Sequence, residues 1–191
     1  MTRRMDITGI WAGETVAILG AGPDMTIELA QKARQYKTIA VNRAIQFAPD
    51  ADMFVALDPL HPFWEAAENF NGIKICGVEC DYDAYYLGMF YETVRISATE
   101  TLQIRNNALA AIRIAVMAGA TKLLLLGFDP ERYEEIHFKK CGFYGFKQGL
   151  EQVIAELIGN GIEIERIDSA EQFFGKPAPK RIKQHAADAE S

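Results

Sequence analysis

The sequence predicts a single α/β domain built as three layers around a mostly parallel sheet. Short runs of aliphatic and β-branched residues alternate with amphipathic stretches about every 15–20 residues, the spacing of parallel strands joined by crossover helices. The 191 residues are 49% hydrophobic, enough for one sizeable core. We expect the domain to span residues 1–175. Residues 176–191 contain prolines and lysines without an apolar period, which predicts a disordered tail.

The first strand–helix unit carries the most informative motif. Residues 16–19 are typical of a buried strand, and residues 25–36 have the pattern of an amphipathic helix with Asp24 as its N-cap. Glycines in the turn between them let the backbone approach a ligand, or only permit a tight turn. The motif is not G-x-G-x-x-G, because Met25 occupies the third glycine position, and it is not a Walker A loop. The turn consists of Gly20, Ala21, Gly22 and Pro23.

Three further strands are predicted in this half of the chain. The first of them ends at Asn42 and continues into a short helical turn, and the second ends at Asp58 before a short aromatic helix. Carboxyl ends of parallel strands meet at one edge of a sheet, where ligands bind, so both residues are candidate ligand contacts. Each also has an ordinary role in capping the turn that follows. The three strands are residues 38–41, 53–57 and 73–78.

The middle of the chain has weaker patterns. Residues 81–91 are rich in tyrosine without a clean period, residues 93–96 are compatible with a short strand, and residues 99–105 have the polar composition of a loop. We expect the tyrosines to pack at the sheet edge or at a subunit interface, with a lid over a nucleobase as the alternative.

In the second half of the chain, apolar strand-like runs again alternate clearly with helical stretches. Asn106 and Asn107 precede a very apolar helix over residues 108–117, which should be buried against the sheet. Residues 122–126 follow as a fully buried strand that ends close to Asp129. A polar loop, a helix and a last edge strand complete the pattern, over residues 131–143, 146–158 and 162–167.

The composition of the chain indicates its cellular compartment and which kinds of partner it is not expected to bind. The net charge of −6 argues against a large nucleic-acid interface, and no apolar run approaches the length of a membrane span. Residues 1–6 lack the apolar segment of a signal peptide. The odd cysteine count is typical of reduced thiols, which predicts a cytoplasmic protein. Cys76 and Cys80 have the spacing of half a zinc site, but no second ligand pair accompanies them.

Four features in fixed order resemble a known group of proteins. They are Gly-Ala-Gly-Pro after the first strand, Val-Asn-Arg-Ala after the second, a strand ending in aspartate, and an Ala-rich helix leading to Leu-Leu-Leu-Leu-Gly-Phe-Asp. This combination is similar to Rossmann-like proteins that include the bacterial CMP-sialic-acid-dependent sialyltransferases and the archaeal 6-hydroxymethylpterin pyrophosphokinase-like proteins. In length the chain most resembles small members encoded by bacteriophages and prophages. The resemblance covers about residues 16–167.

The resemblance implies a nucleotide site and a catalytic base. In the sialyltransferases the glycine-rich turn, the asparagine after the second strand and the polar start of the Ala-rich helix face the donor nucleotide. A histidine after the Gly-Phe-Asp strand acts as general base there, and His137 is the candidate in this sequence. An exposed loop histidine without a function is the alternative. Ala21 lies in the turn where the family carries asparagine. The matching nucleotide-facing positions are Gly20, Gly22, Pro23, Asn42, Asn106 and Asn107.

Three functional hypotheses follow. The first is a nucleotide-dependent transferase, most like a nucleotide-sugar glycosyltransferase, which needs no metal or other cofactor. The second is a Mg²⁺-dependent pyrophosphoryl or phosphoryl transferase, in which Asp58 and Asp129 hold the cation. The third is a non-catalytic nucleotide-binding phage accessory protein. In all three the partner is a nucleotide or nucleotide sugar, with no membrane or nucleic-acid role, and a homo-oligomer stays open.

Overall fold

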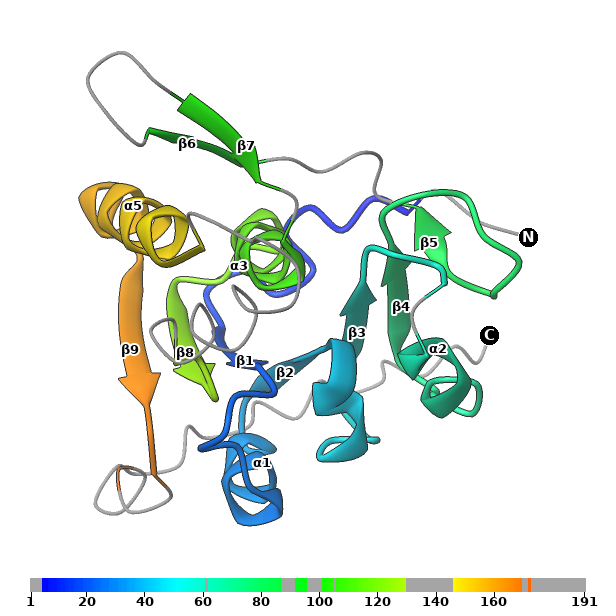
Figure 1. The fold of residues 1–191 in the computed structure, drawn as a ribbon. Coiled ribbons are helices and arrows are strands. Elements are labelled where there is room, and N and C mark those ends of the chain that lie inside the picture. The colour runs from blue at the N-terminus through cyan, green and yellow to red at the C-terminus, as the bar shows by residue number, and fades with distance from the viewer. Residues whose placement is uncertain are drawn as a thin grey trace, which may run out of the picture.

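A computed structural model describes residues 5–60, 62–86, 92–95, 101–104, 106–129, 146–169 and 172, and the structural statements below concern these residues. Seven strands form one sheet in the order β5-β4-β3-β2-β1-β8-β9, and every pairing within it is parallel (Figure 1). The strands are β1 Thr15–Leu19, β2 Lys37–Val41, β3 Met53–Ala56, β4 Ile73–Cys76, β5 Tyr85–Tyr86, β8 Lys122–Leu126 and β9 Glu163–Ile167. The parallel sheet predicted from the sequence is confirmed.

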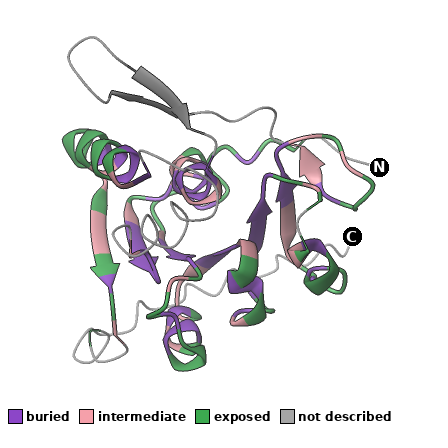
Figure 2. Ribbon diagram, viewed as in Figure 1, coloured by how far each residue is buried: buried purple, intermediate pink, exposed green. Residues whose placement is uncertain are grey.

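Helices cover both faces of this sheet and complete the three layers. One face carries α3 (Asn107–Met117) and α5 (Phe146–Gly159), and the other carries α1 (Ile27–Ala33), the 3₁₀ helix η1 (Asn42–Gln46) and α2 (Phe63–Ala66). Alternation along the strands produces the two cores, because neighbouring side chains point to opposite faces. In β1, Val16 and Ile18 pack under α3 and α5, whereas Ala17 and Leu19 pack under α1. The central strands β1, β2 and β8 are accordingly buried after their first residue, and β3 is buried along its whole length (Figure 2).

The first helix begins later than the sequence predicts. The backbone N–H of Met25 donates to the carbonyl of Gly22, so the chain makes an extra turn before helical geometry starts. Thr26 is the N-cap, because its Oγ1 accepts from the N–H of Leu29 at 3.1 Å. Asp24 is exposed and is not the cap, so that prediction is wrong.

The middle of the chain differs from the prediction in two places. Residues 99–105, expected as a loop, include β7 (Thr101–Ile104), which pairs with β6 (Glu92–Arg95) in an antiparallel hairpin separate from the main sheet. β5 makes Tyr85 and Tyr86 the edge of the main sheet, as the edge-packing interpretation of the tyrosines requires. Tyr82 stacks on the buried Trp64 with ring centroids 4.9 Å apart.

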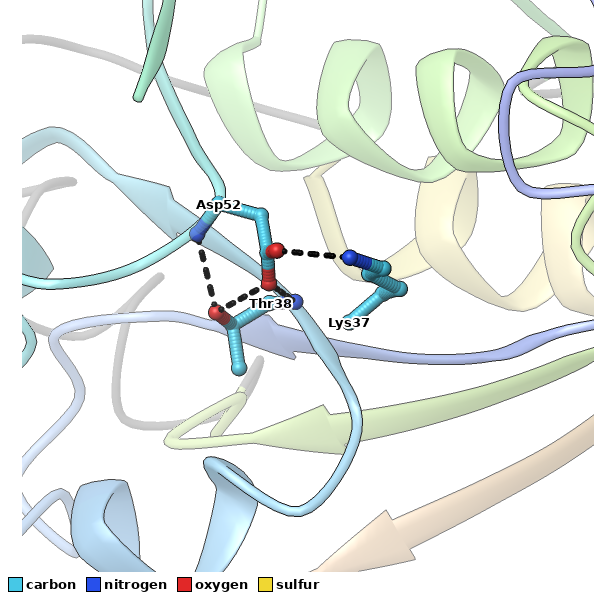
Figure 3. Close-up of polar contacts among 3 residues, drawn as sticks. All are labelled: Lys37, Thr38 and Asp52. Atoms are coloured by element: carbon cyan, nitrogen blue, oxygen red, sulfur yellow. Dashed lines mark hydrogen bonds and ion pairs between the residues drawn. The ribbon is translucent and has the colours of Figure 1, made fainter. Parts of the chain in front are cut away.

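At the amino end of the sheet, β2 and β3 are joined by side chains (Figure 3). One oxygen of Asp52 accepts from Lys37 Nζ at 3.0 Å, and the other accepts from the backbone N–H of Thr38 at 2.9 Å and from its Oγ1 at 3.1 Å. The same hydroxyl accepts from the N–H of Asp52. This cluster satisfies the polar groups of the nearly buried Thr38.

Candidate functional site

The strand order places a topological switch point between β1 and β8. From β1 the chain adds β2, β3, β4 and β5 on one side, and β8 and β9 then pair on the other side. In open α/β sheets generally, ligands bind outside the carboxyl ends of the strands near such a point. The glycine turn follows β1, and residues 127–129 follow β8, so both predicted segments lie here.

The glycines of the turn hold it against the loop after β8. The N–H of Gly20 donates to the carbonyl of Leu126 at 2.7 Å, and the N–H of Gly22 donates to the carbonyl of Gly127 at 3.0 Å. A Cβ at Gly22 would lie 2.5 Å from the Gly127 oxygen, closer than any side chain tolerates. Gly127 itself has a φ of +66°. We call residues 20–22 and Gly127 the glycine contact, and backbone packing explains why glycine stands there.

Asn42 directly follows β2, and its geometry is unusual in two respects. Its φ of 51° is left-handed, the only such value for a non-glycine residue in the described part of the chain. Its Oδ1 is buried and accepts no hydrogen bond within the described structure. A buried acceptor without a donor costs about 1–3 kcal/mol, so Asn42 combines a strained backbone with an unpaired polar atom.

The two asparagines before α3 have different roles. Asn106 is the N-cap that the sequence predicts, because its Oδ1 accepts from the N–H groups of Ala108 and Leu109 at 2.8 and 3.2 Å. Asn107 reaches the neighbouring strand instead, and its Oδ1 accepts from the N–H of Leu57 at 2.6 Å. This bond ties the start of α3 to the carboxyl end of β3, at the same sheet edge as Asn42.

The two aspartates predicted as an alternative metal site lie at separate strand ends. Asp58 is exposed, and its Oδ1 accepts from the N–H of Leu60 at 3.0 Å, the turn-capping geometry of a short Asx turn. Asp129 is half-buried after β8. Two strands stand between β3 and β8, so their ends are about 14 Å apart. The described residues contain no cluster of three acidic, histidine or cysteine side chains able to hold a metal.

Cys76 is a buried thiol with little nucleophilic character. Burial in the core is the main cause that raises its pKa to about 11, and the nearby Cys80 thiol contributes to the same rise. Cys76 and Cys80 are free cysteines, and no further metal ligand joins them among the residues described here.

Two further residues bear on the site, His137, which the sequence predicts as a base, and Arg43, which it does not predict. His137 lies outside the described residues, so its role as a base stays a prediction. Sequence reasoning did not single out Arg43, although it stands directly after Asn42 in the Val-Asn-Arg-Ala motif. Its side chain is exposed at the same sheet edge. The feature that could have indicated a role for Arg43 is its position, since it is a cationic residue next to the end of the second strand of a parallel sheet.

Comparisons with protein-family models, with curated proteins and with solved structures give no match for this chain. Across the ranges that the structure describes, no helix has both the length and the apolar character of a membrane span. A function for this protein therefore has to be inferred from its own residues.

Proposed function

We propose that this chain is a nucleotide-dependent transferase, most like a nucleotide-sugar glycosyltransferase, whose nucleotide binds over the carboxyl ends of β1, β2 and β3. The observation that carries the proposal is the buried, unpaired Oδ1 of the left-handed Asn42. Backbone strain and unpaired polar atoms persist where the surrounding structure enforces them, and they concentrate at ligand sites. A ligand that donates a hydrogen bond to this oxygen would remove the penalty.

The position of Asn42 indicates which part of a nucleotide would donate. It stands about 20 residues after the glycine turn, the spacing at which a residue after the second strand of a dinucleotide-binding fold contacts the ribose hydroxyls. In those folds the residue is an acid, and here an amide carbonyl offers the same acceptor without a charge. We therefore assign the ribose, or an amino group of the base, to Asn42.

The neighbouring groups support a site at this edge. Leu57 is held by Asn107 at 2.6 Å, so the end of β3 is fixed beside that of β2. The glycine contact fixes the turn after β1 on the other side. These contacts fix the ends of β1, β2 and β3 relative to one another, which lowers the ordering cost of binding. The transfer step needs a base for the acceptor hydroxyl, and His137 is the residue we propose for it, with a contribution of about 10²–10⁴-fold.

The test uses two variants of Asn42 and a set of ligands. Calorimetric titration with CMP, UMP, AMP and GMP, with and without Mg²⁺, measures affinity for wild type, Asn42→Ala and Asn42→Gly. We expect at least one nucleotide to bind, and both variants to weaken it by about 1–3 kcal/mol. Glycine accepts the left-handed backbone without strain, so a loss of binding in Asn42→Gly isolates the amide.

The outcomes separate the three hypotheses. Failure of every nucleotide to bind would overturn the proposal, and unchanged affinity in both variants would return Asn42 to a turn-capping role. Binding without transfer from a CMP-sugar or UDP-sugar donor indicates a non-catalytic module. Turnover that requires Mg²⁺ would replace the first hypothesis with phosphoryl transfer through Asp58 and Asp129.

A further inference from the structure

Arg43 lies at the edge where the nucleotide is proposed to bind, and it forms no ion pair with any residue that the structure describes. Among the arginines whose side chains the structure describes, the others are each bound to an acid: Arg34 to Asp50 at 2.8 Å, Arg113 to Glu156 at 2.7 Å, and Arg166 to Asp168 at 3.4 Å. Arg43 has no such partner within those ranges, and its side chain is exposed. Its guanidinium is therefore available to an anion from solution.

The glycine turn is poorly equipped to hold a phosphate. The N–H groups of Gly20 and Gly22 donate to the loop after β8, and Pro23 has no N–H. Met25 donates back to Gly22, and the cap Thr26 takes the N–H of Leu29. Both glycines thus use their N–H groups within the protein, and within residues 20–24 only Ala21 and Asp24 keep a backbone donor that a phosphate could take.

We infer that Arg43 binds the phosphate carried by the sugar of the nucleotide, so that the negative charge of the ligand lies over the end of β2 and not over the glycine turn. This inference rests on the proposed function. The guanidinium presents paired N–H donors that match two phosphate oxygens. Asn42 and Arg43 are consecutive, so one would contact the sugar or base and the other its phosphate.

An arginine at the end of the second strand also contacts a phosphate in other α/β folds. In dinucleotide-binding folds an arginine near the end of the second strand accommodates a phosphate on the ribose 2′ position. A phosphate on the 5′ position offers the same oxygens from the other side of the sugar. The shared chemistry is a phosphate monoester on ribose, and the ligands of the test distinguish its two positions.

The test compares Arg43→Gln with Arg34→Gln, which makes the same charge change in an arginine that is already paired. Calorimetry measures affinities of cytidine, 5′-CMP and 3′-CMP, and of adenosine, 5′-AMP and 2′,5′-ADP, at low and high salt. We expect Arg43→Gln to weaken the phosphorylated ligands on the order of ten- to a hundredfold, with nucleoside affinity changed less than about twofold. The gain in affinity that the phosphate gives should fall with salt in wild type and in Arg34→Gln, but not in Arg43→Gln. Arg34→Gln should behave as wild type.

The results distinguish this inference from the proposal beneath it. If a nucleotide binds and Asn42→Gly weakens it, but Arg43→Gln keeps the full phosphate gain, the inference is overturned while the nucleotide site stands. If wild type binds no ligand of either series, both are overturned. A larger loss for the 5′ than for the 2′ and 3′ phosphates places the 5′ oxygens at Arg43, and the reverse places the ribose phosphate there. Unchanged unfolding midpoints in both variants confirm that the fold is intact.

Discussion

The two ends of β2 lie in one strand and differ in how their polar groups are paired. At the amino end, Asp52 joins Lys37 and Thr38, and the polar atoms of this cluster have partners (Figure 3). At the carboxyl end, Asn42 has a left-handed backbone and a buried oxygen without a donor in the described structure. The paired polar groups therefore stabilise the amino edge of the sheet, whereas the unpaired oxygen and the left-handed backbone of Asn42 cost free energy at the carboxyl edge.

The edges of the neighbouring strands follow the same division. Lys122, the first residue of β8, pairs with Glu163 at 3.2 Å and Glu165 at 3.5 Å at the amino edge. The carboxyl edge has the guanidinium of Arg43, which pairs with no acid in the described part of the chain, and the close backbone packing of the glycine contact. Substitutions at the amino edge should thus change stability alone, whereas those near Asn42 should separate stability from binding.

The largest effect should come from Gly127→Ala. The new Cβ would lie 2.8 Å from the carbonyl oxygen of Gly20, and the φ of +66° strains any residue but glycine. Overpacking and left-handed strain together should lower the free energy of unfolding by about 2–5 kcal/mol. Gly161→Ala is the matched control, because its φ is +85° and its Cβ would meet nothing within 4 Å. Equal losses in urea unfolding of the two variants would show that the glycine contact is not tight.

Asp52→Ala should have the next largest effect. It removes the acceptor for the N–H and hydroxyl of the buried Thr38, which should lower the free energy of unfolding by about 1–2 kcal/mol. Asp52→Asn keeps one acceptor oxygen and should lose less. Nucleotide affinity should be unchanged in both, and a loss of affinity in calorimetry would break the contrast between the two edges.

Asn42→Gly should move stability in the opposite direction. It removes the buried oxygen and the left-handed strain, and the added freedom of glycine in the unfolded chain offsets part of the gain. We expect the free energy of unfolding to rise by up to about 1 kcal/mol while nucleotide binding weakens by about 1–3 kcal/mol. Destabilisation in urea unfolding would mean that the amide supports the fold, and Asn42 would then resemble Asp52.

The smallest effect concerns alkaline pH at the amino edge. The hydrogen bond from Lys122 to Glu163 raises the pKa of Lys122 above its ordinary value of 10.5. The stability from this pairing is therefore fully present below pH 10.5 and is lost as the pH rises through the higher pKa of the folded state. Because both partners are partly exposed, the loss should stay below about 1 kcal/mol. Urea unfolding from about pH 9 to 12 should show it in wild type and not in Lys122→Met.

Strand positions were predictable where the sequence has a clear apolar period. Leu123 to Leu126 and Val16 to Leu19 are central strands, and a run of apolar residues there leaves no alternative to burial on both sides. β7 was missed because Thr101 and Gln103 look like loop residues, and a hairpin outside the main sheet does not need an apolar face on both sides. The cap of α1 was missed because the bond from Met25 to Gly22 delays the helix, and such a turn leaves no mark in a hydrophobic pattern.

The candidate site was predictable only as a set of strand ends. Asn42 follows the second strand in the sequence, but neither its left-handed backbone nor its buried oxygen is visible there. Asn106 and Asn107 looked equivalent, and only the fold shows that Asn107 reaches Leu57. Side-chain partners depend on which strands become neighbours, and in this protein the neighbours of β1 come from opposite parts of the chain.

That last feature sets an order for folding during synthesis. β2 follows β1 closely, whereas β8 leaves the ribosome roughly 100 residues later, so one edge of β1 stays unpaired while that stretch is synthesised. The bonds from Gly20 and Gly22 to the loop after β8 can form only when that strand has docked. The glycine contact therefore forms late relative to the pairing of β1 with β2, because it waits for a strand that is distant in the sequence.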